Sequence, residues 1–147
     1  MWSRASRKEA MAIAVGTRTP AQMFALVFGV VYLVMGIVGF AVTGFDDFAG
    51  AIFDEKLIVF ALNPLHNVVH LLLGAVWIGA SRTHDAAKGI NLLFGIVLLV
   101  VFILGMVGAL KWLAIEGAES ANNYLHLATA VLAIYFGSAG AAAIRPA

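Results

Sequence analysis

Three of the four histidines lie in two similar segments of the chain, and each follows an asparagine by three residues. Imidazole nitrogens bind haem iron and transition metals, and they also form hydrogen bonds with amides. Asparagine and histidine in this pattern therefore indicate either a ligand site or a set of hydrogen bonds between helices. We expect one interhelical polar site, formed by Asn63, His66, Asn67, His70, Asn123 and His126.

Three chemistries fit this set of residues. His70 and His126 could bind haem b between two helices, as histidines in membrane bundles do. His66, His70 and His126 together would suffice for zinc, with water as a fourth ligand. We favour the third interpretation, in which the side chains form hydrogen bonds that fix helix register, worth about 0.5–2 kcal/mol each. Accordingly we expect no metal and no cofactor, with haem b as the alternative.

The elements that must position these residues are four apolar runs without a charged side chain. Each run exceeds the roughly 20 residues that a helix needs to cross a bilayer. A hydrophobic content of 63% and a mean hydropathy of +0.98 agree with an integral membrane protein. The runs are Thr19–Phe45, Leu57–Ser81, Gly89–Leu110 and Ala121–Ile144. We expect an all-α four-helix bundle over residues 19–144, with spans at about 21–42, 62–81, 89–110 and 121–142, after a basic segment at 1–18.

The charged residues predict how the bundle is oriented. Seven of the nine basic residues fall before the first run, between the second and third, or after the fourth: Arg4, Arg7, Lys8, Arg18, Arg82, Lys88 and Arg145. Basic residues in short loops stay cytoplasmic. We therefore expect a multi-pass protein of the bacterial plasma membrane with both termini in the cytoplasm, and no nucleic-acid partner. We expect His84, in the basic loop, to be solvated.

The two halves of the chain resemble each other. Phe28–Gly39 aligns with Phe94–Gly105 at seven of twelve positions, and Asn67–Leu71 aligns with Asn123–Leu127. A rival register pairs His66 with His126 and leaves the histidine on the same helix face. Each half of the chain contains two helices, so both halves should cross the membrane in the same direction. They should therefore be parallel repeats related by a pseudo-two-fold axis along the membrane normal.

Small residues should let the helices approach closely inside this bundle. On a helix of 100° per residue they form a stripe in the first run and a matching one in the third, and the polar residues of the second run share one face. The third-run stripe is Asn91, Gly95, Leu98, Phe102 and Gly105, and the polar stripe of the second run is Asn63, His66, Asn67, His70, Gly74, Trp77 and Ser81. The packing glycines are Gly29, Gly36, Gly39, Gly95 and Gly105. Asn63 is the expected N-cap of the second helix, and Asn122 or Asn123 that of the fourth.

The residue types that are missing restrict the function. The chain has no cysteine, and the four runs contain no Asp, Glu, Lys or Arg. No catalytic motif accompanies the histidines, so we expect no enzyme. The leading hypothesis is an accessory subunit of a membrane complex or a small homo-oligomer. The alternatives are a haem-b electron carrier and a binder of lipid or another hydrophobic ligand.

Several motifs resemble a bacterial, largely actinobacterial, membrane-protein family known as domain of unknown function 4383. They are the segments Thr19–Gly29, Gly39–Phe45, Asn63–Leu71 and Asn123–Leu127. The most specific is Asn63–His70, which reads NPLHNVVH. The resemblance extends from about Arg18 to Gly140. It implies four spans in a plasma membrane, and it implies no particular activity.

Overall fold

The chain is all-α, apart from one short hairpin of strands, in a computed structural model that describes residues 18–51 and 53–141. Within these residues the four helices are α2 (Pro20–Thr43), α3 (Pro64–Ala80), α4 (His84–Met106) and α5 (Ala121–Gly137). The loop between α2 and α3 contains the antiparallel strands β1 (Lys56–Leu57) and β2 (Phe60–Ala61), and the loop between α4 and α5 contains the short helix η1 (Lys111–Leu113). The basic residues Arg4, Arg7, Lys8 and Arg145, and the residue Ile144, lie outside the described residues.

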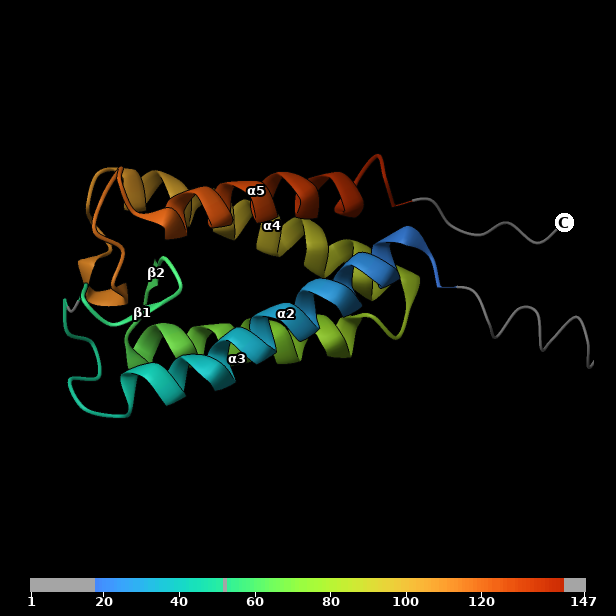
Figure 1. The fold of residues 1–147 in the computed structure, drawn as a ribbon. Helices are drawn as coiled ribbons and strands as arrows, with labels where there is room; N and C mark the ends of the chain where they lie inside the picture. Colours follow the sequence, from blue (N-terminus) through green and yellow to red (C-terminus); the bar gives the residue numbers. More distant parts are fainter. Residues whose placement is uncertain (1–17, 52, 142–147) are drawn as a thin grey trace, which may run out of the picture.

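The helices form two pairs, α2 with α3 and α4 with α5, which lie one over the other (Figure 1). The pairs meet near the start of α2, where Asn91 of α4 donates from Nδ2 to the carbonyl oxygen of Ala21 at 3.0 Å. At the opposite end of the bundle, which we call the loop end, β1, β2 and η1 lie between the pairs (Figure 1). The two long loops are therefore part of the packed structure at that end.

Side-chain caps fix where three of the helices begin. The hydroxyl of Thr19 accepts from the Gln22 amide, and the Gln22 side chain accepts from the Thr19 amide, which is a complete capping box. Asn63 caps α3 ahead of a proline, as expected, by accepting from the His66 amide at 2.8 Å. Thr83 caps α4. Because of this cap, α4 begins at His84, five residues before the expected Gly89.

The fourth helix differs from the expectation at both ends. Ser120 stands at its N-cap, so neither Asn122 nor Asn123 caps the helix, and both are buried in its first turn. The helix ends at Gly137, whereas the expected span continued to 142. Short apolar residues such as Ala141 continue the hydropathy signal without continuing the helix.

Glycines allow each pair of helices to pack closely. A Cβ atom added at Gly29 would lie 2.8 Å from Ile78 Cγ1, and one added at Gly95 would lie 2.7 Å from Ile134 Cγ1. A Cβ at Gly36 would come equally close to the backbone of α3. The glycines expected to mediate packing are thus buried where the helices approach closely, and Gly74 and Gly137, which were not among them, come still closer to the opposite backbone.

Two further glycines lie against asparagine amides at the loop end. Gly39 of α2 faces the side chain of Asn67, and Gly105 of α4 faces the side chain of Asn123. A side chain at either glycine would collide with the amide oxygen. The same glycine–asparagine contact therefore occurs once in each helix pair.

Candidate functional site

Three histidines meet inside the bundle near its loop end. His66 and His70 come from α3, and His126 comes from α5. All three are buried, and their ligand-capable nitrogen atoms lie within 4.8 Å of one another. The ring centroid of His66 is 4.4 Å from that of His70 and 5.9 Å from that of His126. The structure therefore places imidazoles from both helix pairs in one cluster, which we call the histidine cluster.

The start of α3 determines how two of these rings are presented. Asn63 and Pro64 begin the helix, so that His66 falls in its first turn and His70 one turn later on the same face. That face also buries Asn67, Gly74 and Trp77, in agreement with the predicted polar stripe. The helix period alone is sufficient to bring the two imidazoles together.

The histidine cluster contains polar atoms for which the described residues supply no partner. They are His66 Nδ1, His70 Nδ1 and Nε2, and His126 Nδ1. The hydroxyl oxygens of Tyr32 and Thr129, outside the cluster, are likewise buried. The ring of Tyr32 packs edge-on against that of His70, with centroids 5.1 Å apart. A buried polar group without a hydrogen bond costs about 1–3 kcal/mol. Such a concentration of unpaired donors and acceptors is typical of a place that binds water, an ion or a ligand.

Asparagine side chains hold the loops that cover this end of the bundle. Asn63 donates from Nδ2 to the carbonyl oxygens of Trp112 at 2.8 Å and Gly50 at 3.0 Å. Asn122 donates from Nδ2 to the carbonyl oxygen of Ala61 at 2.8 Å. Each helix pair therefore binds the loop of the other pair.

The remaining predicted asparagines bind within their own helix pair. Asn67 donates from Nδ2 to Thr43 Oγ1 at 2.9 Å, and Asn123 donates to the carbonyl oxygen of Gly117. The six residues expected at one polar site thus separate into two groups. The three histidines form a cluster, and the asparagines organise packing and loops around it.

At the other end of the bundle the structure shows contacts that the sequence analysis did not identify. Trp77 donates from Nε1 to Asn91 Oδ1 at 3.0 Å, although both residues were recognised only as members of separate stripes. His84 is partly buried, and its Nδ1 lies 3.0 Å from Thr19 Oγ1. The expectation that His84 is simply solvated is therefore wrong, because α4 begins at this residue and brings it to the cap of α2.

An apolar cavity of about 370 Å³ opens between α2 and α5, away from the histidine cluster. It is lined by Pro20, Met23, Phe24, Val27, Phe28 and Phe136. The rings of Phe24 and Phe136, which both line the cavity, are stacked with their centroids 5.1 Å apart. The cavity carries no chemistry of its own, but an aliphatic chain is compatible with such a lining.

These features define an all-α protein in which two helices, Pro20–Thr43 and His84–Met106, are long and apolar enough to cross a membrane. The chain belongs to the family described as "Domain of unknown function (DUF4383)", whose pattern matches residues 22–139. The resemblance noted from the sequence is thereby confirmed. No curated protein and no solved structure matches the chain.

Proposed function

We propose that this chain is a multi-pass plasma-membrane protein that serves, without catalysis, as an accessory subunit of a membrane complex or as a small homo-oligomer. The observation that supports a membrane location is the outward display of large apolar side chains on every helix. Ile37 of α2 is 58% exposed, Leu72 of α3 62%, Ile103 of α4 55% and Val131 of α5 57%. So much exposed apolar surface is unfavourable in contact with water and favourable in contact with lipid.

The shorter helices α3 and α5 are also compatible with crossing the bilayer. Each has 17 residues, and at 1.5 Å per residue each is about 26 Å long, a little less than the ~30 Å hydrocarbon core. Local thinning and interfacial side chains accommodate such a mismatch. Trp112 and Tyr124 are exposed at the loop end, where an aromatic belt would lie.

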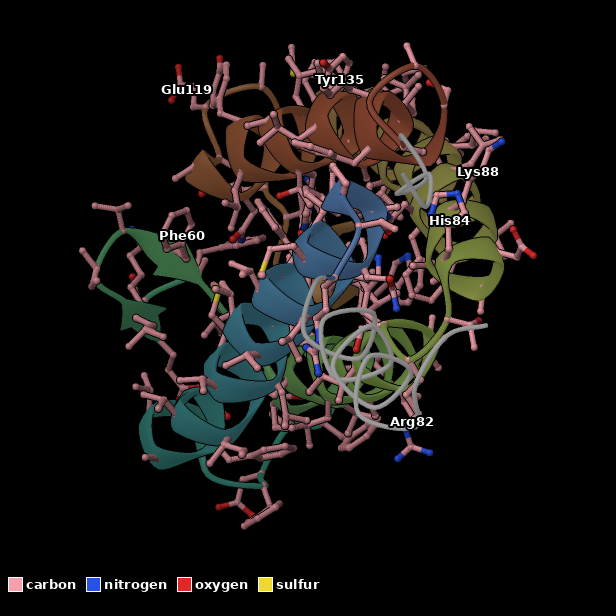
Figure 2. All side chains as sticks on the ribbon, turned by 90° about the vertical axis from the view of Figure 1, so that its right-hand side faces the viewer. Phe60, Arg82, His84, Lys88, Glu119 and Tyr135 are labelled. Carbon is pink, nitrogen blue, oxygen red and sulfur yellow. The ribbon has the colours of Figure 1, made fainter. Side chains whose placement is uncertain are left out.

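The distribution of charge supports cytoplasmic termini. Figure 2 shows Arg82 and Lys88 at the end of the bundle where α2 begins. Asp54, Glu116 and Glu119 belong to the loops of the opposite end. By the positive-inside rule the basic end faces the cytoplasm.

The matching contacts in the two helix pairs support a duplicated helical hairpin. Gly29 meets Ile78 in the first pair, and Gly95 meets Ile134 in the second. The glycine–asparagine contacts of Asn67 and Asn123 follow the same register, which favours pairing these two asparagines over the rival alignment. The units then have the same direction through the membrane.

The absence of cysteine makes the topology directly testable. Asp54, Glu119 and Arg82, which are all exposed, are replaced by cysteine one at a time. Intact cells that express each variant are then labelled with a membrane-impermeant maleimide. We expect labelling at Asp54→Cys and Glu119→Cys, and labelling at Arg82→Cys only after the membrane is permeabilised. Labelling of all three positions from outside would contradict the proposed orientation.

The accessory role has a separate test. An affinity-tagged chain, expressed at its native level, is extracted in mild detergent and analysed by size and mass spectrometry. We expect a defined complex with other membrane subunits or with further copies of the chain. A monomer that co-purifies with no partner under these conditions would exclude the role.

The apolar cavity supports a second candidate function, binding of a lipid acyl chain. Val27→Phe would place a ring in the cavity and should displace a bound lipid in native mass spectrometry. Val30→Phe lies on the same helix outside the cavity lining and should have no effect. Equal lipid retention by both variants and the parent chain would argue against this candidate.

A further inference from the structure

We propose that His66, His70 and His126 form a binding site for a late first-row transition-metal ion, with zinc as the representative. The proposal does not depend on the accessory role. It rests on three buried imidazoles that converge from two helices and on four of their six nitrogen atoms, at least one in each ring, that have no hydrogen-bond partner among the described residues.

The donor set determines which ions can bind. Three neutral imidazoles suit zinc, copper and nickel, whereas magnesium and calcium require oxygen ligands. α2, α3 and α5 contain no Asp or Glu that would add such oxygens. The site should therefore discriminate strongly in favour of nitrogen-preferring ions.

The geometry requires only a small adjustment. Around a tetrahedral zinc ion with bonds of 2.0–2.1 Å, imidazole nitrogens lie about 3.3 Å apart. The corresponding atoms here already lie within 4.8 Å. His66 and His70 are one helical turn apart, so rotation of their side chains brings both rings to one point without moving the backbone.

Two hydroxyl groups beside the histidine cluster complete the site. Tyr32 packs against His70, and its hydroxyl lies near that of Thr129 of α5. Three protein ligands leave one position of a tetrahedral ion open for water. The hydroxyls of Tyr32 and Thr129 are suited to hydrogen-bond that water and so to orient it.

Haem fits this site less well than an ion. Gly29 and Gly74 do not leave open space for a porphyrin, because both are in contact with the opposite helix: a Cβ at Gly29 would meet Ile78, and one at Gly74 would lie 2.5 Å from the backbone nitrogen of Leu33. His66 also stands directly beside His70. A rigid porphyrin needs a flat, open space between its two ligands, and the His66 ring beside His70 reduces that space.

Hydrogen bonding between helices is the interpretation favoured from the sequence, and for the histidines it stays a prediction. In the structure four of their nitrogen atoms have no hydrogen bond within the described residues. A metal ion would satisfy one nitrogen of each ring, and the bound water and hydroxyls would pair with others. The metal site therefore accounts for burial that hydrogen bonds among these side chains do not explain.

The test uses the full chain, purified in detergent with a tag that contains no histidine. The protein is stripped with a chelator, loaded with zinc, desalted and measured for bound metal and for zinc X-ray absorption. We expect one zinc per chain with three nitrogen ligands, and no retention of magnesium or calcium. We expect His66→Asn, His70→Gln and His126→Gln each to weaken binding at least about tenfold. His84→Gln, outside the histidine cluster, is the matched control and should bind normally.

A measurement on the parent chain keeps the proposal falsifiable if a variant fails to fold. Zinc should raise the midpoint of its thermal unfolding, and magnesium at the same concentration should not. The proposal is overturned if the parent chain retains no zinc, if folded single-histidine variants bind as well as the parent, or if His84→Gln loses binding to the same extent. A Soret band after haem addition, without zinc retention, would replace the ion by haem. None of these outcomes affects the cysteine-labelling test of topology.

Discussion

The two helix pairs share their packing contacts but differ in the polar side chains that they bury. Glycine lies against isoleucine and against asparagine in both pairs, at matching places. In the proposed register the positions that differ and are buried in at least one pair include His66 and Asn122, Leu73 and Thr129, Gly74 and Ala130, and Trp77 and Ala133. Many of the contacts that hold each pair together are thus common to both, whereas Gly74 packs against the Leu33 backbone in the first pair only and Gly137 against the Leu92 backbone in the second pair only. The residues that add chemistry, or a second contact across the bundle, are concentrated in the α2–α3 pair.

The largest effect should come from making the first pair resemble the second at one position. In Gly74→Ala the new Cβ would lie 2.5 Å from the Leu33 backbone nitrogen and 2.7 Å from the Gly29 oxygen, and neither atom can move alone. We expect destabilisation of about 3 kcal/mol, at the upper end of overpacking costs. Reversible denaturation in detergent, followed by circular dichroism, measures it.

Gly79→Ala provides the control on the same helix. A Cβ there meets nothing within 4 Å, and alanine is the better helix former by about 1 kcal/mol. We expect no loss of stability. If Gly74→Ala were as stable as Gly79→Ala, the two pairs would not differ in how closely their helices approach.

The next effect concerns the asparagines that hold the opposite loops. Asn63→Ala removes the cap of α3 and the bonds to Trp112 and Gly50, and should cost about 2 kcal/mol. Asn122→Ala chiefly removes the bond to Ala61 and should cost about 1 kcal/mol. The same denaturation assay compares them, and equal costs would show that the cap and the additional bond of Asn63 contribute nothing.

Trp77→Phe tests a bond between the two helix pairs that has no second copy, because Ala133 stands at the position that matches Trp77. It leaves Asn91 Oδ1 without its donor and should destabilise the bundle by about 1 kcal/mol. The exposed Trp112→Phe is the control and should change stability by less than about 0.5 kcal/mol. A double variant with Asn91→Ala should be less than additive, because the two side chains form one bond. Full additivity would contradict the contact.

The smallest effect is expected at the helix caps. Thr19 belongs to a reciprocal capping box and also contacts His84, so Thr19→Ala should cost about 1 kcal/mol. Thr83 makes one exposed bond at 3.3 Å, so Thr83→Ala should cost about 0.5 kcal/mol. Thermal midpoints in detergent distinguish the two, and the reverse order would show that the contact between α2 and His84 is not stabilising.

Much of the interior was predictable from the sequence because it depends on helix period alone. The stripe through Gly29, Gly36 and Gly39 and the stripe through His66 and His70 are buried as expected. His126 joins them because the internal similarity relates it to His70, and this places the two residues at similar depth.

The loops and the helix ends were not predictable in the same way. Asn122 lies in the first turn of α5 and bonds to Ala61, a residue far away in the sequence, and no periodicity encodes the path of that loop. The start of α4 was misjudged because Asp85 and Lys88 looked like loop residues, although Thr83 caps a helix that contains both. The role of Tyr32 had only a weak signal, a large polar ring in a stripe of small residues.

The crossed bonds of Asn63 and Asn122 make the two covering loops mechanically dependent on each other. Releasing either loop breaks a bond that the other helix pair supplies, so the lid over the imidazoles opens as a unit. Solvent would then reach the interior in one concerted event with a single rate. The buried amides of Leu62 and Ile115, in different loops, should accordingly exchange deuterium together.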